Sequence, residues 1–243
     1  NNQLNELDVQ QAQNVTVHAG HWLDLGHVYS SGDVYTRTQG LSLSDRLTAN
    51  SFRFDAGQGA SVIDGRLNVS TLTGKAHGIT VRQAISVDQM ELDSRGGTLE
   101  LNAELETLQN LTLRGTNIEQ NAALFSGAEL RASSDANYRQ RANIASAEDL
   151  WITASGDITM ESGALSHTHS GQIRYQAGND IALSSLDAGG STVSLTADRG
   201  SISNNNGSDI NVFADRLEMS AGAGIGRAAA LATDIRILDA QSQ

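Results

Sequence analysis

Short alternations of apolar and polar residues, each interrupted by Gly, Asp or Asn, recur along the whole chain. In the stretch SLTADRGSISNNNGSDINVFADRLEMSAGAGIG, residues 194–226, apolar residues stand two apart for a few positions, a turn follows, and the alternation resumes. Alternation with period 2 predicts short β-strands with one buried face. Because no sustained helical period is present, the pattern predicts an all-β protein.

These predicted strands belong to a repeat. The apolar triplet Leu150, Ile152 and Ala154 has equivalents in each of the next three repeats, at successive offsets of 23, 20 and 24 residues. A turn that contains Gly, Asn or Asp follows each triplet, so the repeat length is about 20–24 residues. The equivalent triplets are Ile173, Tyr175 and Ala177, then Val193, Leu195 and Ala197, then Leu217, Met219 and Ala221.

A repeat of this length with one buried strand face predicts a right-handed parallel β-helix, or β-solenoid, with coils of about 20–24 residues. The right hand follows from the general preference of crossover connections. We expect a single rod segment over residues 1–243, with the clearest repeats at 149–226 and looser coils at 1–148. A dozen coils stacked about 4.8 Å apart would form a rod on the order of 60 Å long.

Composition agrees with this fold. The chain contains no proline, which sheets confine to edges and bulges, and only 4% aromatic residues, so small and branched aliphatic side chains must form a thin core. It contains no cysteine, which excludes disulfides and thiolate metal sites. Stability must therefore come from repeated backbone hydrogen bonding and aliphatic packing.

Charge and hydropathy restrict the partners. The net charge of −12 argues against nucleic acid and anionic membrane surfaces as partners. No apolar run approaches the roughly 20 residues of a membrane span, so we expect no membrane insertion. The chain begins without Met and shows no signal peptide, so we expect it to be a piece of a longer polypeptide.

The segments DLWITASGDITM, GNDIALSSLDAGGSTVSLTADRGSI and LEMSAGAGIG resemble the repeats of bacterial large exoproteins of the filamentous haemagglutinin family, which are exported by two-partner secretion. The resemblance covers residues 149–226, and the upstream half is similar only in texture. It implies a surface or secreted β-helix that serves as an adhesin or as the stalk of a distal toxin. The implied partners are a receptor or glycan on a host or neighbouring cell, and an outer-membrane transporter for the parent chain.

The family's secretion domain carries Asn-Pro motifs, whereas this chain has no proline. The resemblance therefore implies a position in the interior or distal part of the rod.

Outward-facing residues of successive repeats should align as a column on one solvent-exposed face. Trp151 beside Arg174 would form a cation–π pair worth roughly 0.5–1 kcal/mol. Together with a row of hydrogen-bond donors that includes Thr153 and Gln176, an exposed Trp could form a platform for a sugar ring. The alternative is that it merely decorates the strand ladder. The expected column consists of Trp151, Arg174, Ser194 and Glu218.

Two carboxylates keep an enzymatic alternative open. Asp157 and Asp180 lie one repeat apart, so they could approach the roughly 5 Å separation of a retaining glycosidase pair. The alternative function is thus a β-helical polysaccharide lyase or glycosidase. In turns, however, Asp more often accepts a hydrogen bond from its own backbone. Arg174, Arg199 and Arg216 share no column, which also argues against an enzyme.

Other chemical motifs give no positive signal. His167 and His169 are two apart and could share a metal ion, but no third ligand is evident. Nucleophile elbows, phosphate-binding loops and zinc-protease motifs are missing. The sequence therefore predicts no catalytic residue, metal or cofactor, and indicates an adhesive or structural rod, secreted or on a bacterial cell surface.

Overall fold

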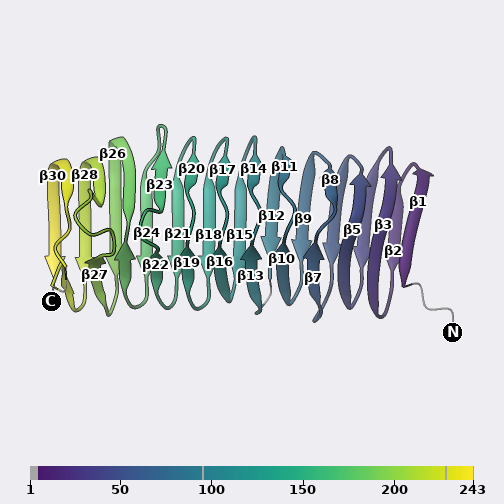
Figure 1. Cartoon of the computed structure of the whole chain (residues 1–243), viewed down its shortest axis with the longest axis horizontal. Coiled ribbons are helices and arrows are strands. Elements are labelled where there is room, and N and C mark those ends of the chain that lie inside the picture. The colour runs from purple at the N-terminus through teal and green to yellow at the C-terminus, as the bar shows by residue number, and fades with distance from the viewer. Residues whose placement is uncertain (1–4, 95, 228, 243) are drawn as a thin grey trace.

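The strands of successive coils stack along one rod. The computed structural model describes residues 5–94, 96–227 and 229–242, and its coils follow one another from the N-terminal to the C-terminal end of the long axis (Figure 1). Each coil pairs in parallel with its neighbours, and the described residues form strands but no helix. The predicted all-β solenoid is confirmed.

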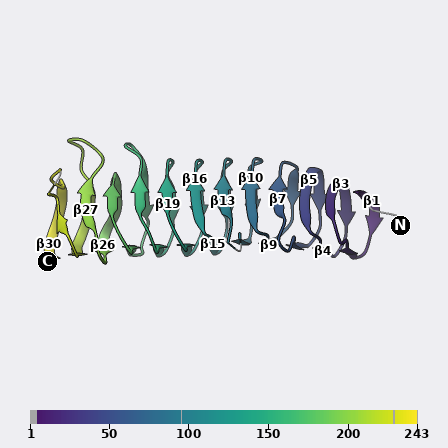
Figure 2. The same cartoon turned by 90° about the horizontal axis from the view of Figure 1, so that it is seen from below.

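Three stacks of strands form three faces of the rod, seen from two directions in Figure 1 and Figure 2. Face 1 consists of β7 (Ala60–Ile63), β10 (Gly78–Val81), β13 (Thr98–Leu101), β16 (Asn117–Gln120), β19 (Tyr138–Gln140), β22 (Ile158–Met160), β25 (Ile181–Leu183), β27 (Ser201–Asn204) and β29 (Gly224–Ile225). Face 2 consists of β8 (Arg66–Asn68), β11 (Ile85–Val87), β14 (Leu105–Thr107), β17 (Leu124–Ser126), β20 (Ile144–Ser146) and β23 (Leu165–Thr168).

Face 3 carries the columns predicted from the sequence. Its strands are β2 (Val15–His18), β4 (Asp33–Arg37), β6 (Ser51–Asp55), β9 (Thr71–Lys75), β12 (Gln89–Asp93), β15 (Leu111–Gly115), β18 (Leu130–Ser134), β21 (Leu150–Ala154) and β24 (Ile173–Ala177). Longer strands cross two faces. Faces 1 and 2 share β1 (Glu6–Ala12), β3 (Trp22–Ser30) and β5 (Gly40–Thr48), and faces 2 and 3 share β26 (Ser185–Ala197), β28 (Val212–Ala221) and β30 (Thr233–Ser242).

Coil length differs along the rod. Leu150 pairs with Ile173, and Val193 pairs with Leu217, which reproduces the predicted offsets of 23 and 24 residues. Upstream, Val34 pairs with Phe52, an offset of only 18 residues. The upstream coils are nevertheless as regularly paired as the later ones, because the difference lies in the corners between strands.

Inward-facing aliphatic side chains form continuous columns within the rod. On face 3 the column passes from Leu111 through Leu130 and Leu150 to Ile173, and each of these residues is fully buried. Burying such a side chain contributes about 1.5–3 kcal/mol relative to leaving it in water. The few aromatic core residues include Phe52 and Phe54, whose ring centroids lie 5.4 Å apart.

A buried polar cluster joins the three faces in the second half of the rod. The hydroxyl of Tyr175, on face 3, donates to Gln140 Oε1 on face 1 at 2.9 Å and lies 2.7 Å from Ser166 Oγ on face 2. Burial raises the pKa of Tyr175, while the hydrogen bond with Ser166 acts in the opposite direction. The phenol is therefore neutral and tethers face 3 to its two neighbours.

Gly74 makes room for an aromatic ring in the core. It stands between Phe54 and Leu92 in the registered pairs of face 3, and a Cβ at this position would clash with Phe54 Cζ. Glycine normally weakens a strand, so its presence here reflects the close approach of the ring.

We therefore predict that Gly74→Ala lowers the free energy of unfolding by about 1–3 kcal/mol, the usual cost of overpacking a core. Gly190→Ala is the control, because a Cβ at Gly190 would have nothing within 4 Å. Urea unfolding followed by circular dichroism gives the two values. Equal midpoints for the two variants would contradict this account of the core.

Candidate functional site

The outer surface of face 3 presents two columns of side chains in register. The predicted column is confirmed, because Trp151 pairs with Arg174, Arg174 with Ser194, and Ser194 with Glu218. The donor-rich row runs parallel to it two residues further along each strand. It consists of Ser133, Thr153, Gln176, Thr196 and Ser220. We call the part of this surface from Thr112 to Gln176 the Trp151 face.

Trp151 lies between two arginines rather than beside one. The guanidinium of Arg174, in the following coil, lies 5.6 Å from the ring centroid, which confirms the predicted pair. The guanidinium of Arg131, in the preceding coil, lies closer, at 4.4 Å. Because both neighbours flank the half-buried ring, a sugar that stacks on Trp151 must first displace a guanidinium, at a cost of roughly 0.5–1 kcal/mol. The tryptophan thus orients the two cations, and its edge faces solvent.

The arginines of the Trp151 face differ in their ionic partners. Arg131 pairs with Glu129 at 2.5 Å, and Arg114 pairs with Glu91 at 3.3 Å. Across the described ranges, no carboxylate lies within ion-pair distance of Arg174. Arg174 is therefore the cation of this face with the most hydrogen-bonding capacity left for a ligand.

Two hollows adjoin on the Trp151 face. One, of about 270 Å³, is bordered by Thr112, Arg131 and Trp151, and the other, of about 430 Å³, by Gln176 and residues of the following coil. Ser133 and Thr153 border both hollows, and the Thr153 hydroxyl donates to Ser133 Oγ at 3.2 Å. The two hollows thus form a shallow surface that is rich in hydroxyl, amide and guanidinium groups.

Asp157 and Asp180 lie one coil apart, at the corner between faces 3 and 1. Asp157 Oδ1 accepts a hydrogen bond from the backbone N–H of Asp180 at 3.1 Å, and Asp180 Oδ1 accepts one from Ser201 N–H at 2.7 Å. Asn137 serves Asp157 in the same way, at 2.9 Å. The expected bond from each aspartate's own backbone is thus corrected, since each side chain binds the backbone of the next coil. We call this series the Asx ladder.

The predicted histidine pair lies apart from the Trp151 face. His167 projects outward from face 2, where its Nδ1 lies 3.4 Å from Asp187 Oδ2, and His169 follows the end of that strand. Among residues 5–94, 96–227 and 229–242, no group of three or more His, Asp or Glu side chains could hold a metal ion. The same residues contain no helix that is long and apolar enough to cross a membrane.

Sequence reasoning did not identify Arg131. The signal was present, because Leu130 and Ala132 precede Leu150 and Ile152 by 20 residues, so extending the repeat upstream would have placed Arg131 beside Trp151. Reasoning from the later repeats alone therefore gave only one of the two cation–π partners.

No family model, curated protein or solved structure matches this chain.

The Asx ladder makes a prediction about stability. Asp157→Ala removes an acceptor from the N–H of Asp180, and we expect this to lower the free energy of unfolding by about 0.5–1.5 kcal/mol. Asp157→Asn keeps a carbonyl oxygen in the same place and should remain close to wild type. Thermal unfolding of the three proteins measures the difference. If both variants lose the same stability, the negative charge, rather than the acceptor, is what matters.

Proposed function

We propose that this protein is a rod segment of a surface-exposed or secreted bacterial exoprotein of the filamentous haemagglutinin type. Its role is attachment to a polysaccharide, or to a glycan-bearing receptor on a host or neighbouring cell. The observation that carries this proposal is the pair of registered outer columns on face 3, with Arg174 and Gln176 side by side on one strand. The sequence resemblance of residues 149–226 supports the same assignment.

The columns suit a polymeric ligand. Equivalent positions recur about every 4.8 Å along the rod, so a repeating chain lying on the Trp151 face would meet similar donors at each coil. Each contact with an exposed hydroxyl, amide or guanidinium is weak, and many contacts made by one chain act together. Attachment would then depend on ligand length as well as on ligand chemistry.

The rod also suits a stalk. Twelve strands of face 3, counting the shared strands β26, β28 and β30, separate its two ends. A distal effector carried by a longer parent chain would be held away from the cell surface at a fixed distance. The parent chain would reach the surface through an outer-membrane transporter, as the resemblance implies.

A polysaccharide lyase or glycosidase on the same fold is the competing proposal. It needs carboxylates that are available to substrate, and Asp157 and Asp180 each use one oxygen to bind the backbone of the next coil. Their position at a corner of the rod also separates them from Arg174, on the strand surface of face 3. Both observations favour attachment over cleavage.

The test is a polysaccharide and glycan binding screen with the purified chain, repeated with Arg174→Gln and Trp151→Ala. We expect the bound ligand to be lost from both variants by about tenfold, because removal of Trp151 releases the two guanidiniums from their positions. Phe125→Ala is the matched control, since Phe125 is an aromatic residue 38% exposed on face 2.

Cleavage is assayed on the same ligands by the release of reducing ends. Binding that fails in the two Trp151-face variants but not in Phe125→Ala, without product release, supports an adhesin. Product release that stops in Asp157→Asn would overturn the proposal in favour of an enzyme. Absence of any binding would leave the stalk role and remove the adhesive one.

A further inference from the structure

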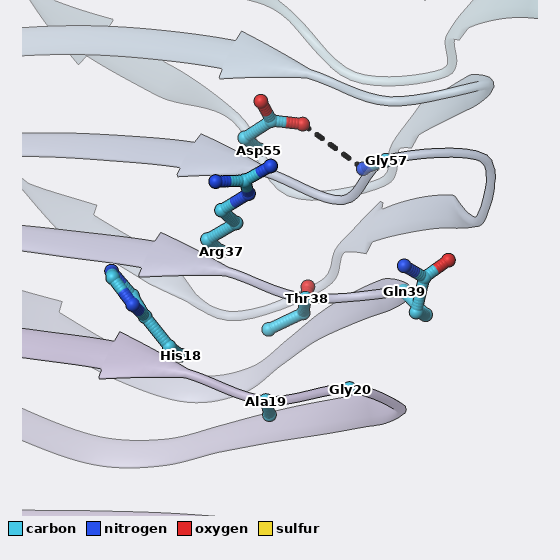
Figure 3. Close-up of a pocket in the computed structure, with 8 residues that line it drawn as sticks. All are labelled: His18, Ala19, Gly20, Arg37, Thr38, Gln39, Asp55 and Gly57. Atoms are coloured by element: carbon cyan, nitrogen blue, oxygen red, sulfur yellow. Dashed lines mark hydrogen bonds between the residues drawn. The ribbon is translucent and has the colours of Figure 1, made fainter.

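A separate hollow of about 420 Å³ lies on face 3 near the N-terminal coils. Figure 3 shows three charged or titratable side chains beside it, His18, Arg37 and Asp55, which come from the ends of β2, β4 and β6. These residues are registered neighbours in successive coils. The turn residues Thr38 and Gln39 complete the part of the lining that matters here.

The cation of this hollow has no counter-ion. In the described part of the chain, no carboxylate lies within ion-pair distance of Arg37, whereas the neighbouring Arg53 stacks on Tyr35 at 5.7 Å. The His18 ring meets the edge of Tyr35 at 5.9 Å, which positions it at the border of the hollow. A guanidinium without a partner binds carboxylates through two parallel hydrogen bonds.

The other polar groups of the hollow are fixed or unpaired. Asp55 Oδ1 accepts a hydrogen bond from Gly57 N–H at 3.0 Å, which holds that carboxylate at the border (Figure 3). The Thr38 hydroxyl is buried, and it has no hydrogen-bond partner among the described residues. Native structures rarely leave such a group unpaired, so it points to a missing partner. A Cβ at Gly20 would meet nothing within 4 Å, so the hollow is open to solvent beside it.

We propose that this hollow binds a sugar residue that carries one carboxylate, a uronate. The sugar carboxylate would accept two hydrogen bonds from Arg37. The sugar hydroxyls would contact Thr38, the Gln39 amide and Asp55.

A mixed ligand fits better than a simple anion. Asp55 would repel a small anion held at Arg37, but it accepts hydrogen bonds from hydroxyl groups, which a sugar supplies on the same molecule. The volume of the hollow also exceeds what a carboxylate alone would fill. The combination of a guanidinium, a carboxylate, an amide and a buried hydroxyl thus corresponds to an acidic sugar.

The experiment is a titration of the full chain with D-glucuronate, followed by the amide resonances of Gly20 and Gly57 in two-dimensional NMR. We expect both resonances to move, with a dissociation constant on the order of 1 mM. D-Glucose, which lacks the carboxylate, and acetate, which lacks the hydroxyls, should each bind at least about tenfold more weakly.

Three variants locate the site. Arg37→Gln should weaken glucuronate binding by about tenfold or more, since it removes the charge-assisted hydrogen bonds. Thr38→Val, which keeps the side-chain shape, should weaken binding several-fold and leave the fold intact. Arg174→Gln makes the same change six coils away on face 3 and should not affect this titration.

Several results would overturn the inference. These are equal binding of glucose or acetate, unchanged binding in Arg37→Gln, or no shift of either glycine amide with glucuronate. The inference does not rest on the proposed function, because the residues involved lie outside the Trp151 face. Failure of the polysaccharide screen through Arg174 would leave the glucuronate titration unaffected, and the reverse also holds.

Discussion

The parallel backbone ladder between coils is the interaction on which the rest of the molecule depends. Each strand donates to and accepts from the equivalent strand of its neighbours, so any residue repeated at the right offset enters a column. Inward columns such as Leu130, Leu150 and Ile173 form the core. Outward columns bring side chains within about 4.8 Å of one another, whether they attract or repel. The chemistry of the surface is therefore set by register.

Register also explains how the charges are distributed. Many carboxylates of this acidic chain are committed, either to arginines of adjacent coils, as in the pair of Glu91 and Arg114, or to backbone N–H groups, as in Asp157 and Asp180. Arg37 and Arg174, by contrast, have no ionic partner among the described residues. Local cationic positions thus exist on a rod whose net charge is −12. Both proposed sites use them.

The sequence predicted the fold because its clearest repeats keep the inward triplet constant. From Leu150 to Ala221 the triplets recur at offsets that match the observed pairing, and the outer column of Trp151 and Arg174 followed directly. The upstream coils escaped alignment because their corners are shorter, so no single offset applies. Arg131 was missed for this reason, although its neighbours follow the same pattern.

Other features depend on geometry that alternation does not encode. The unpaired hydroxyl of Thr38 arises where a strand turns into a corner, and its burial follows from the packing of three coils rather than from its sequence neighbours. The acceptors of the Asx ladder are similar. An aspartate in a turn can bind its own backbone or that of the next coil, and only the stacking distance decides between them.

The register of face 3 can be measured directly, because the chain has no native cysteine and two introduced ones are unique. Nitroxide labels on Lys75→Cys/Thr196→Cys lie six coils apart, and those on Lys75→Cys/Ser220→Cys lie seven coils apart. Double electron–electron resonance should give narrow distributions near about 29 and 34 Å, one coil spacing apart. Broad distributions, or distances that do not increase by one coil, would contradict the registered rod and both sites built on it.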